Sequence, residues 1–182
     1  MGMDKHLFLG ANTADGLVHY FDRLVEMYDL KKLYILKGGN GVGKSTLMRK
    51  FARAFEDQCS ITYLYCSGDP KSLDAVVIES LQVAIVDGTH PHPLEPKYPG
   101  LIDEIINLGE FIDSSKLTVT KSKIDEITAK KRAAYSAAFK KLSEARELHK
   151  KIEEFYTPAV DFKRVDELCD ELISRTRKSS EK

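Results

Sequence analysis

The sequence predicts an α/β fold, with a mostly parallel sheet flanked by helices and followed by a C-terminal α-helical hairpin. Two observations predict it. In the first part of the chain, short apolar runs alternate with segments of helical periodicity, the pattern of a parallel sheet with crossover helices. Between residues 111 and 157 there is no glycine or proline, and apolar residues recur every three or four positions. We therefore divide the chain into a core, residues 1–113, and a helical extension, residues 114–182.

The charge changes at the same boundary. Residues 1–113 carry 11 Lys and Arg against 16 Asp and Glu, a net of −5, whereas residues 114–182 carry 17 against 12, a net of +5. The whole chain has zero net charge. This disfavours a strongly basic nucleic-acid-binding protein but leaves room for a local basic patch.

The elements of the core follow from apolar patterning. Continuous or β-branched apolar runs predict strands, and three- and four-residue spacing predicts helices. Three clear strands are few for such a sheet. We expect others from the run 6–9, from a segment assigned otherwise here, or from a partner unit. The predicted strands are 33–36, 61–65 and 81–86; the predicted helices are 17–28, 45–55 and 99–111; residues 72–80 are ambiguous.

The extension predicts one long helix over residues 122–156 and a second over 161–177. Thr157-Pro158 ends the first, because a residue before proline resists the helical conformation. The short connection predicts an antiparallel pair. This pair is either a packing subdomain, or a lid or arm that binds a partner or nucleic acid through its positive charge.

Residues 38–45 match the phosphate-binding P-loop motif G-x-x-x-x-G-K-[ST] in full, between a predicted strand and a predicted helix. The glycines allow positive φ angles and close approach of backbone N–H groups to phosphate oxygens. Lys44 would reach the β- and γ-phosphates, the Ser45 hydroxyl would bind Mg²⁺, and Thr46 would lie by the α-phosphate. The predicted nucleotide-binding residues are Gly38, Gly39, Asn40, Gly41, Val42, Gly43, Lys44, Ser45 and Thr46.

A P-loop needs a second magnesium-binding carboxylate, and Asp87 ends the apolar run 83–86. We assign Asp87 to Mg²⁺; the alternative is a strand-end Asp that caps the next turn. Asp69 follows the strand 61–65 and is the candidate to orient an attacking water or hydroxyl, or else a simple turn residue. Lys44, Asp69 and Asp87 are therefore the catalytic candidates.

Two further features carry weaker chemical signals. His90 and His92 form a His-x-His pair that can bind zinc or nickel, but no third ligand has suggestive spacing, so a phosphate-facing or loop-fixing role is favoured. Cys66 is read as a small buried residue rather than a nucleophile. The three cysteines lack CxxC spacing, and the chain shows neither a secretory signal nor a membrane span, which predicts a cytoplasmic protein.

The nucleotide and the reaction remain to be chosen. The [NT]-K-x-D segment that reads guanine is missing, since the nearest string, residues 120–123, lacks the Asp. ATP is therefore favoured over GTP. The leading hypothesis is Mg²⁺-dependent ATP hydrolysis; the alternatives are a nucleotide or small-molecule kinase, and a non-catalytic ATP-dependent switch or assembly module.

Several strings resemble a family of uncharacterised bacterial P-loop ATPases. They are residues 6–13, 36–48, 66–74, 86–92 and 99–100 with 106–110, so the similarity covers most of residues 5–112. The resemblance implies an ATP-binding domain of unassigned physiological role. Longer members of that family carry two tandem P-loop units, whereas this chain has one. It also has Gly68 where Ser is usual and Asn40 where Pro is common. A single unit implies a homodimer or a second P-loop unit as partner.

Overall fold

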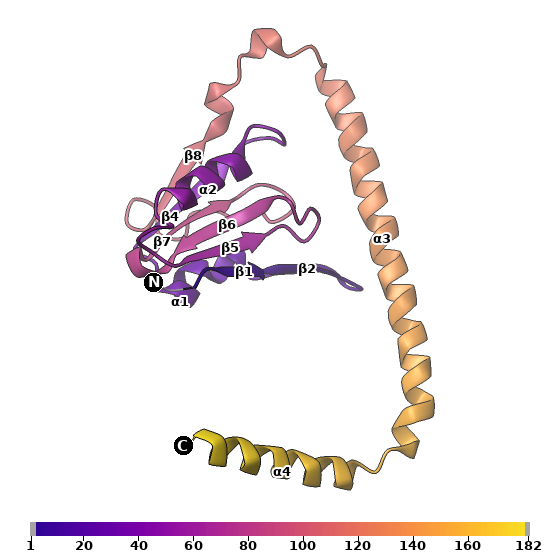
Figure 1. The fold of residues 1–182 in the computed structure, drawn as a ribbon. Helices are drawn as coiled ribbons and strands as arrows, with labels where there is room; N and C mark the ends of the chain where they lie inside the picture. The colour runs from indigo at the N-terminus through magenta and orange to yellow at the C-terminus, as the bar shows by residue number, and fades with distance from the viewer. Residues whose placement is uncertain (1–2, 181–182) are drawn as a thin grey trace.

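The computed structural model describes residues 3–180 and shows a six-stranded mixed sheet beside a pair of long C-terminal helices (Figure 1). The strand order is β1-β5-β6-β7-β4-β8, and every strand is parallel to the others except β6, which is antiparallel to both neighbours. The predicted α/β class is confirmed in this mostly parallel form. The strands are β1 (Lys5–Phe8), β2 (Gly10–Thr13), β3 (Gly16–His19), β4 (Lys32–Lys37), β5 (Ile61–Tyr65), β6 (Leu73–Ile78), β7 (Val83–Asp87) and β8 (Asp103–Asn107); the α-helices are α1 (Leu24–Tyr28), α2 (Lys44–Arg53), α3 (Lys121–Tyr156) and α4 (Phe162–Ser180).

The centre of the sheet is buried on both faces. In β6, Ala75 and Val77 face a core that includes Phe21 and Leu24, whereas Val76 and Ile78 face a second core that includes Met48 of α2. Because successive side chains of a strand point to opposite faces, a strand covered on both sides is apolar throughout. This explains why residues 72–80 show neither helical nor alternating periodicity.

Three strands lie where the sequence gives a weak or misleading signal. The run 6–9 belongs to β1, an edge strand parallel to β5, and the ambiguous segment contains β6. The helix predicted over 99–111 is wrong: residues 103–107 form β8, an edge strand parallel to β4, and a short 3-10 helix follows. Gly100 has φ of 77°, which starts the segment with a turn, and Leu101 is 77% exposed rather than packed inward.

The helix predicted over 17–28 is also wrong in its first half. β2 and β3 form an antiparallel hairpin, and a 3-10 turn (Phe21–Arg23) leads into the short α1. The hairpin turn is built by Thr13, whose hydroxyl donates to the Gly16 carbonyl at 2.8 Å and accepts from the Asp15 N–H at 3.1 Å. Gly16 has φ of 103°, a conformation that favours glycine.

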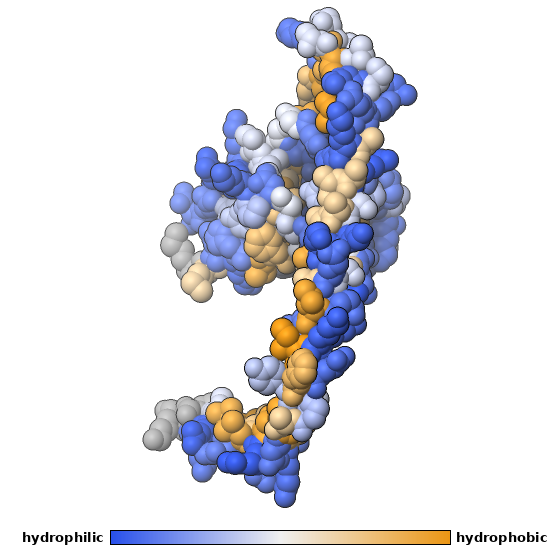
Figure 2. Space-filling model, turned by 90° about the vertical axis from the view of Figure 1, so that its right-hand side faces the viewer, coloured by the Kyte–Doolittle hydropathy of each residue, from blue (hydrophilic) through white to orange (hydrophobic). Residues whose placement is uncertain are grey.

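The two C-terminal helices have nearly the predicted bounds, but the predicted antiparallel hairpin is wrong. After a 3-10 turn (Thr157–Ala159), α4 departs across the end of α3 instead of running back along it (Figure 1). Apolar side chains follow α3 and continue onto α4 at the surface (Figure 2). Among residues 3–180, no helix is long and apolar enough to cross a membrane.

Candidate functional site

The P-loop occupies the connection between β4 and α2. Gly43 precedes the first residue of α2 with φ of 92°, and Gly41 has φ of 84°, so both adopt a conformation that side chains resist. A Cβ at either position would meet no atom within 4 Å, so the requirement for glycine comes from the backbone and not from crowding. This geometry turns the loop toward the N-terminus of α2, where backbone N–H groups and the helix dipole favour a bound anion.

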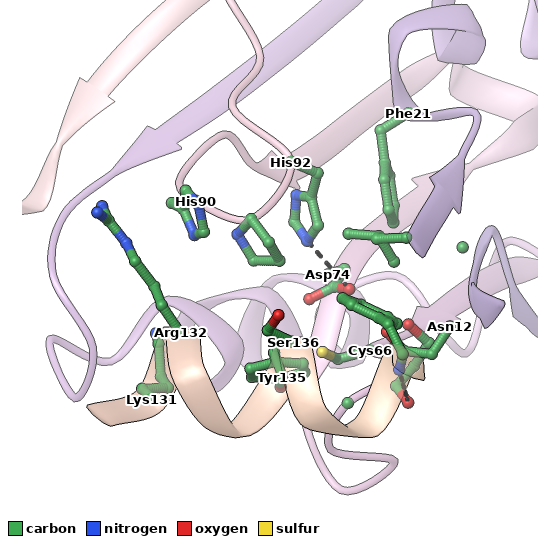
Figure 3. Close-up of a pocket in the computed structure, with 16 residues that line it drawn as sticks. Asn12, Phe21, Cys66, Asp74, His90, His92, Lys131, Arg132, Tyr135 and Ser136 are labelled. Atoms are coloured by element: carbon green, nitrogen blue, oxygen red, sulfur yellow. Dashed lines mark hydrogen bonds and ion pairs between the residues drawn. The ribbon is translucent and has the colours of Figure 1, made fainter. Parts of the chain in front are cut away.

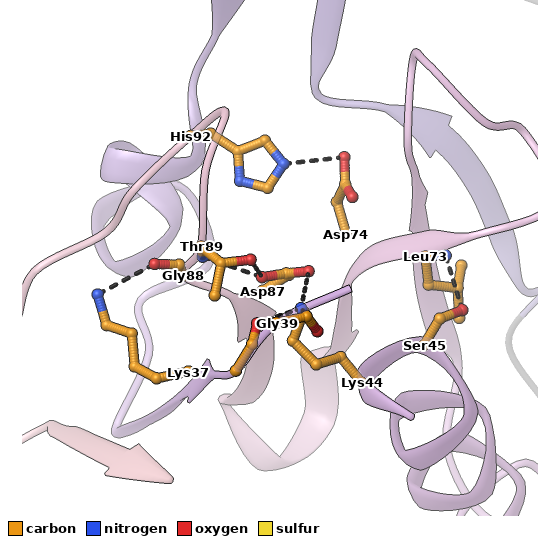
Figure 4. Close-up of polar contacts among 11 residues, drawn as sticks. Lys37, Gly39, Lys44, Ser45, Leu73, Asp74, Asp87, Gly88, Thr89 and His92 are labelled. Carbon is orange, nitrogen blue, oxygen red and sulfur yellow. Dashed lines mark hydrogen bonds and ion pairs between the residues drawn. The ribbon is translucent and has the colours of Figure 1, made fainter. Parts of the chain in front are cut away.

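Lys44 is the first residue of α2, and its side chain packs against the P-loop, so the residue is 8% exposed. Its Nζ donates to the carbonyl oxygens of Gly38 at 2.6 Å and Gly39 at 3.0 Å, and lies 3.5 Å from Oδ2 of Asp87 (Figure 4). The ammonium group therefore stands between the loop and the carboxyl end of β7. A cation held here by neutral carbonyls and one carboxylate can pair with a phosphate oxygen without moving far.

Ser45 and Asp87 supply the two oxygens assigned to magnesium. The Ser45 Oγ accepts from the Leu73 N–H at 3.0 Å, and Asp87 Oδ1 accepts from the N–H and hydroxyl of Thr89 at 2.9 and 2.5 Å. Both side chains are thus held in place at the same edge of the sheet. Mg²⁺ takes one or two protein oxygens and completes its octahedron with phosphate and water. The donor set fits that chemistry, and residues 3–180 contain no cluster of three His, Cys, Asp or Glu that could hold a metal.

Asp69 lines the cavity at the P-loop, but its carboxylate makes hydrogen bonds within its own turn. Its Oδ2 accepts from the Ser72 hydroxyl at 2.6 Å, and its Oδ1 accepts from the Lys71 N–H at 3.2 Å. The Ser72 hydrogen bond, followed by the backbone one, holds the pKa of the exposed Asp69 carboxyl below its usual value. Its assignment to orient a nucleophile stays a prediction, and both of its oxygens already have partners in the loop.

A buried pair that sequence reasoning missed lies beside the P-loop. His92 Nε2 is 3.2 Å from Asp74 Oδ2, and the two residues are 5% and 7% exposed. Burial alone would lower the pKa of His92, but the hydrogen bond and charge of Asp74, with the charge of Asp87, outweigh it and raise that pKa. Because β6 is antiparallel, Asp74 at its start lies at the same edge as the carboxyl ends of β5 and β7. The sequence signal for this pair was Asp74, the only charged residue in an otherwise apolar strand.

The loop after β7 is fixed by Lys37, which sequence reasoning also missed. Its Nζ donates to the carbonyl oxygen of Gly88 at 3.0 Å (Figure 4). It also donates to the Leu94 carbonyl oxygen at 2.8 Å and pairs with Glu95. These contacts hold the chain that carries Asp87.

The structure also places the histidine and cysteine candidates. Of the two histidines considered as metal ligands, His92 pairs with Asp74. Burial raises the pKa of the Cys66 thiol, in keeping with its prediction as a packing residue.

These groups surround one cavity of about 520 Å³. The P-loop with Lys44, Asp87 and the Asp74–His92 pair line it, and α3 contributes Lys131 and Tyr135. The cavity thus has the size of a small-molecule site and converging charged groups at one end. Comparison with known proteins finds no match for this chain, whether by family model, by curated sequence or by solved structure.

Proposed function

We propose that the chain binds ATP with Mg²⁺ at the P-loop and hydrolyses it. One observation carries the proposal: the buried Lys44 ammonium lies between the P-loop carbonyls and Asp87, 3.5 Å from its carboxylate. This places a cation, a strand-end carboxylate and a helix N-terminus around one space. Those are the groups that a nucleotide triphosphate and its metal require.

Each residue has a role in this proposal. The backbone of residues 38–46 cradles the phosphates, and Lys44 neutralises charge that develops on the transferred phosphoryl group. Ser45 and Asp87 hold Mg²⁺, and Asp69 or Asp74 orients the water that attacks. The family resemblance of residues 5–112 supports ATP as the nucleotide.

Calorimetric titration of the purified chain with ATP and Mg²⁺ tests the proposal. Lys44→Ala should abolish binding, whereas Lys50→Ala, an exposed lysine on the same helix, should bind as the wild type does. Release of inorganic phosphate, lost in Lys44→Ala, would establish hydrolysis. Failure of the folded wild-type chain to bind ATP, or equal binding by Lys44→Ala, would refute the proposed site. GTP in place of ATP should bind more weakly.

A second candidate function is an ATP-dependent assembly module, and the exposed apolar side chains of α3 and α4 favour it. Leu148, Ile152 and Phe155 on α3 are 62%, 53% and 80% exposed, and apolar residues of α4 continue the surface (Figure 2). A second copy of this chain is the occupant we propose for it, in line with the partner unit that the resemblance implies. Light scattering with and without ATP would show a doubled mass if the helices form this interface, and a constant monomer mass would exclude it.

A further inference from the structure

A second chamber lies between α3 and the core (Figure 3). It adjoins the cavity at the P-loop. It has a volume of about 320 Å³ and shares Cys66, Gly68, Asp74 and residues 90–92 with the P-loop cavity, so the two spaces meet. The shared residues Asp74 and His92 line the P-loop cavity together with Asp87, the residue proposed for the metal. A molecule in the chamber would therefore face the transferable phosphoryl group.

The walls of this chamber are mostly apolar. Leu17 lines it from β3, Phe21 from the turn after β3, Pro91 from the loop after β7, and Phe139 from α3. The main polar group from the hairpin is Asn12, whose amide donates to the Ser67 carbonyl at 3.0 Å. The lining also includes His90, Lys131 and Arg132, but most of its surface is apolar. The space therefore suits a ring-shaped body better than a polyol, because a polyol would place more of its hydroxyl groups against apolar walls.

The helix α3 closes the chamber on its open side. Tyr135 reaches the core, where its hydroxyl oxygen would lie 2.7 Å from a Cβ built on Gly68, so the two elements are in close contact. Further along α3, Arg146 pairs with Asp15 in the β2–β3 turn at 2.6 Å. The helix α3 is therefore attached to the core at two points, which a lid over the chamber, one of the alternatives for the extension, would need.

The Asp74–His92 pair lines both spaces at their junction. Its His92 Nδ1 is buried and has no hydrogen-bond partner within the described part of the chain. A buried ion pair rarely adds net stability over packed apolar groups, so its place between an apolar chamber and a phosphate site points to chemistry. Asp74 is the carboxylate that a bound hydroxyl would meet, and His92 is the residue that positions it.

We propose that this chamber binds a small alcohol with an aromatic or fused-ring body and that the alcohol accepts the γ-phosphoryl group of ATP. The proposal rests on the ATP site proposed above. The alcohol oxygen forms a bond to the γ-phosphorus as the bond from that phosphorus to the β–γ bridging oxygen breaks. ADP leaves with the bonding electron pair, and the hydroxyl proton passes to the Asp74 carboxylate and then to solvent. The products are a phosphate monoester and ADP, and hydrolysis is the same reaction with water as acceptor.

A panel of ring alcohols tests the assignment. The purified full chain is incubated with ATP, Mg²⁺ and adenosine, cytidine, thymidine or pyridoxine, with glycerol and inositol as polar controls. Mass spectrometry should detect a phosphate monoester of at least one ring alcohol, formed in step with ADP, and none of glycerol or inositol. A chain that binds and hydrolyses ATP but phosphorylates no ring alcohol would overturn the acceptor proposal and leave the ATPase. A chain that does not bind ATP would overturn both.

Variants locate the reaction in the chamber. Ser136→Trp fills the chamber from α3 and should abolish monoester formation while ATP binding persists; Ala137→Trp, the neighbouring exposed position, should leave both unchanged. Asp74→Asn should slow monoester formation by about 100-fold or more, as loss of a general base does. His92→Leu should do likewise, and His92→Gln, whose amide can still donate to Asp74, should restore activity. Normal phosphorylation in Ser136→Trp would place the acceptor elsewhere and refute the proposal.

Discussion

Gly88→Ala is expected to destabilise the core because Gly88 lies where two buried groups converge. A Cβ at Gly88 would fall well inside van der Waals contact with Cγ2 of Ile35 and 3.2 Å from the carbonyl oxygen of Leu94. Neither neighbour can yield easily: Ile35 is completely buried, and the Leu94 carbonyl accepts from Lys37 at 2.8 Å. Overpacking of this kind costs about 1–3 kcal/mol, and rigid neighbours place Gly88→Ala in the upper half of that range.

The assay is thermal unfolding without nucleotide. For a chain of this length, each kcal/mol lowers Tm by about 2–4 °C, so a loss of about 2–3 kcal/mol predicts a fall of about 4–12 °C. Gly39→Ala is the matched control, because a Cβ there meets no atom within 4 Å and the glycine has no positive φ angle. Gly39→Ala should unfold close to the wild-type temperature. If Gly88→Ala did so too, the close packing of the β7 loop against β4 would be refuted.

Three further predictions concern the site and its attachments. Arg146→Ala, which breaks the pair with Asp15, should speed amide hydrogen exchange in the middle of α3, whereas Lys141→Ala, which breaks the ion pair with Glu144 within the helix, should not. His92 binds its proton more tightly when folded, so the free energy of unfolding should fall as pH rises from about 6.5 through the raised pKa; urea unfolding of His92→Gln should lack this decrease. Ser45→Ala should remove most of the gain in ATP affinity that Mg²⁺ provides, measured by calorimetry with and without EDTA; an unchanged magnesium effect would remove Ser45 from the metal site.

The parts of the site that lie close together in the sequence were predictable from it. The P-loop is one continuous segment whose motif can be recognised directly, with glycines at positions of positive φ, and Asp87 is the last residue of an apolar strand. The structure puts Lys44 and Asp87 3.5 Å apart because β4 and β7 are neighbouring parallel strands, with Leu36 paired to Asp87. The predicted strand 61–65 also agrees with β5, whose β-branched and aromatic residues give a clear signal.

The failures share a physical cause, which is that short apolar segments take their conformation from their neighbours. Residues 101–108 can be written as one face of a helix, but the backbone of residues 103–107 pairs with β4 and places alternate residues on opposite faces. Residues 17–19, likewise predicted as helical, pair with β2 as the second strand of a hairpin, so α1 begins only at Leu24. The antiparallel arrangement of α3 and α4 rested on a short connection alone, and the 3-10 turn at residues 157–159 leaves α4 pointing away.

The orientation of β6 determines which chemistry the site can perform. Asp74 is the second residue of a six-residue strand, and its antiparallel direction puts it at the same edge as the ends of β5 and β7. In a parallel β6 the same residue would lie near the opposite end of the strand, three residues or about 10 Å from its present place at 3.3 Å per residue. The phosphate cavity would then keep Lys44 and Asp87 but lose the buried carboxylate that faces the chamber under α3. The P-loop carries the proposed ATP site, and the single reversed strand brings the buried Asp74 carboxylate to the chamber proposed for the alcohol.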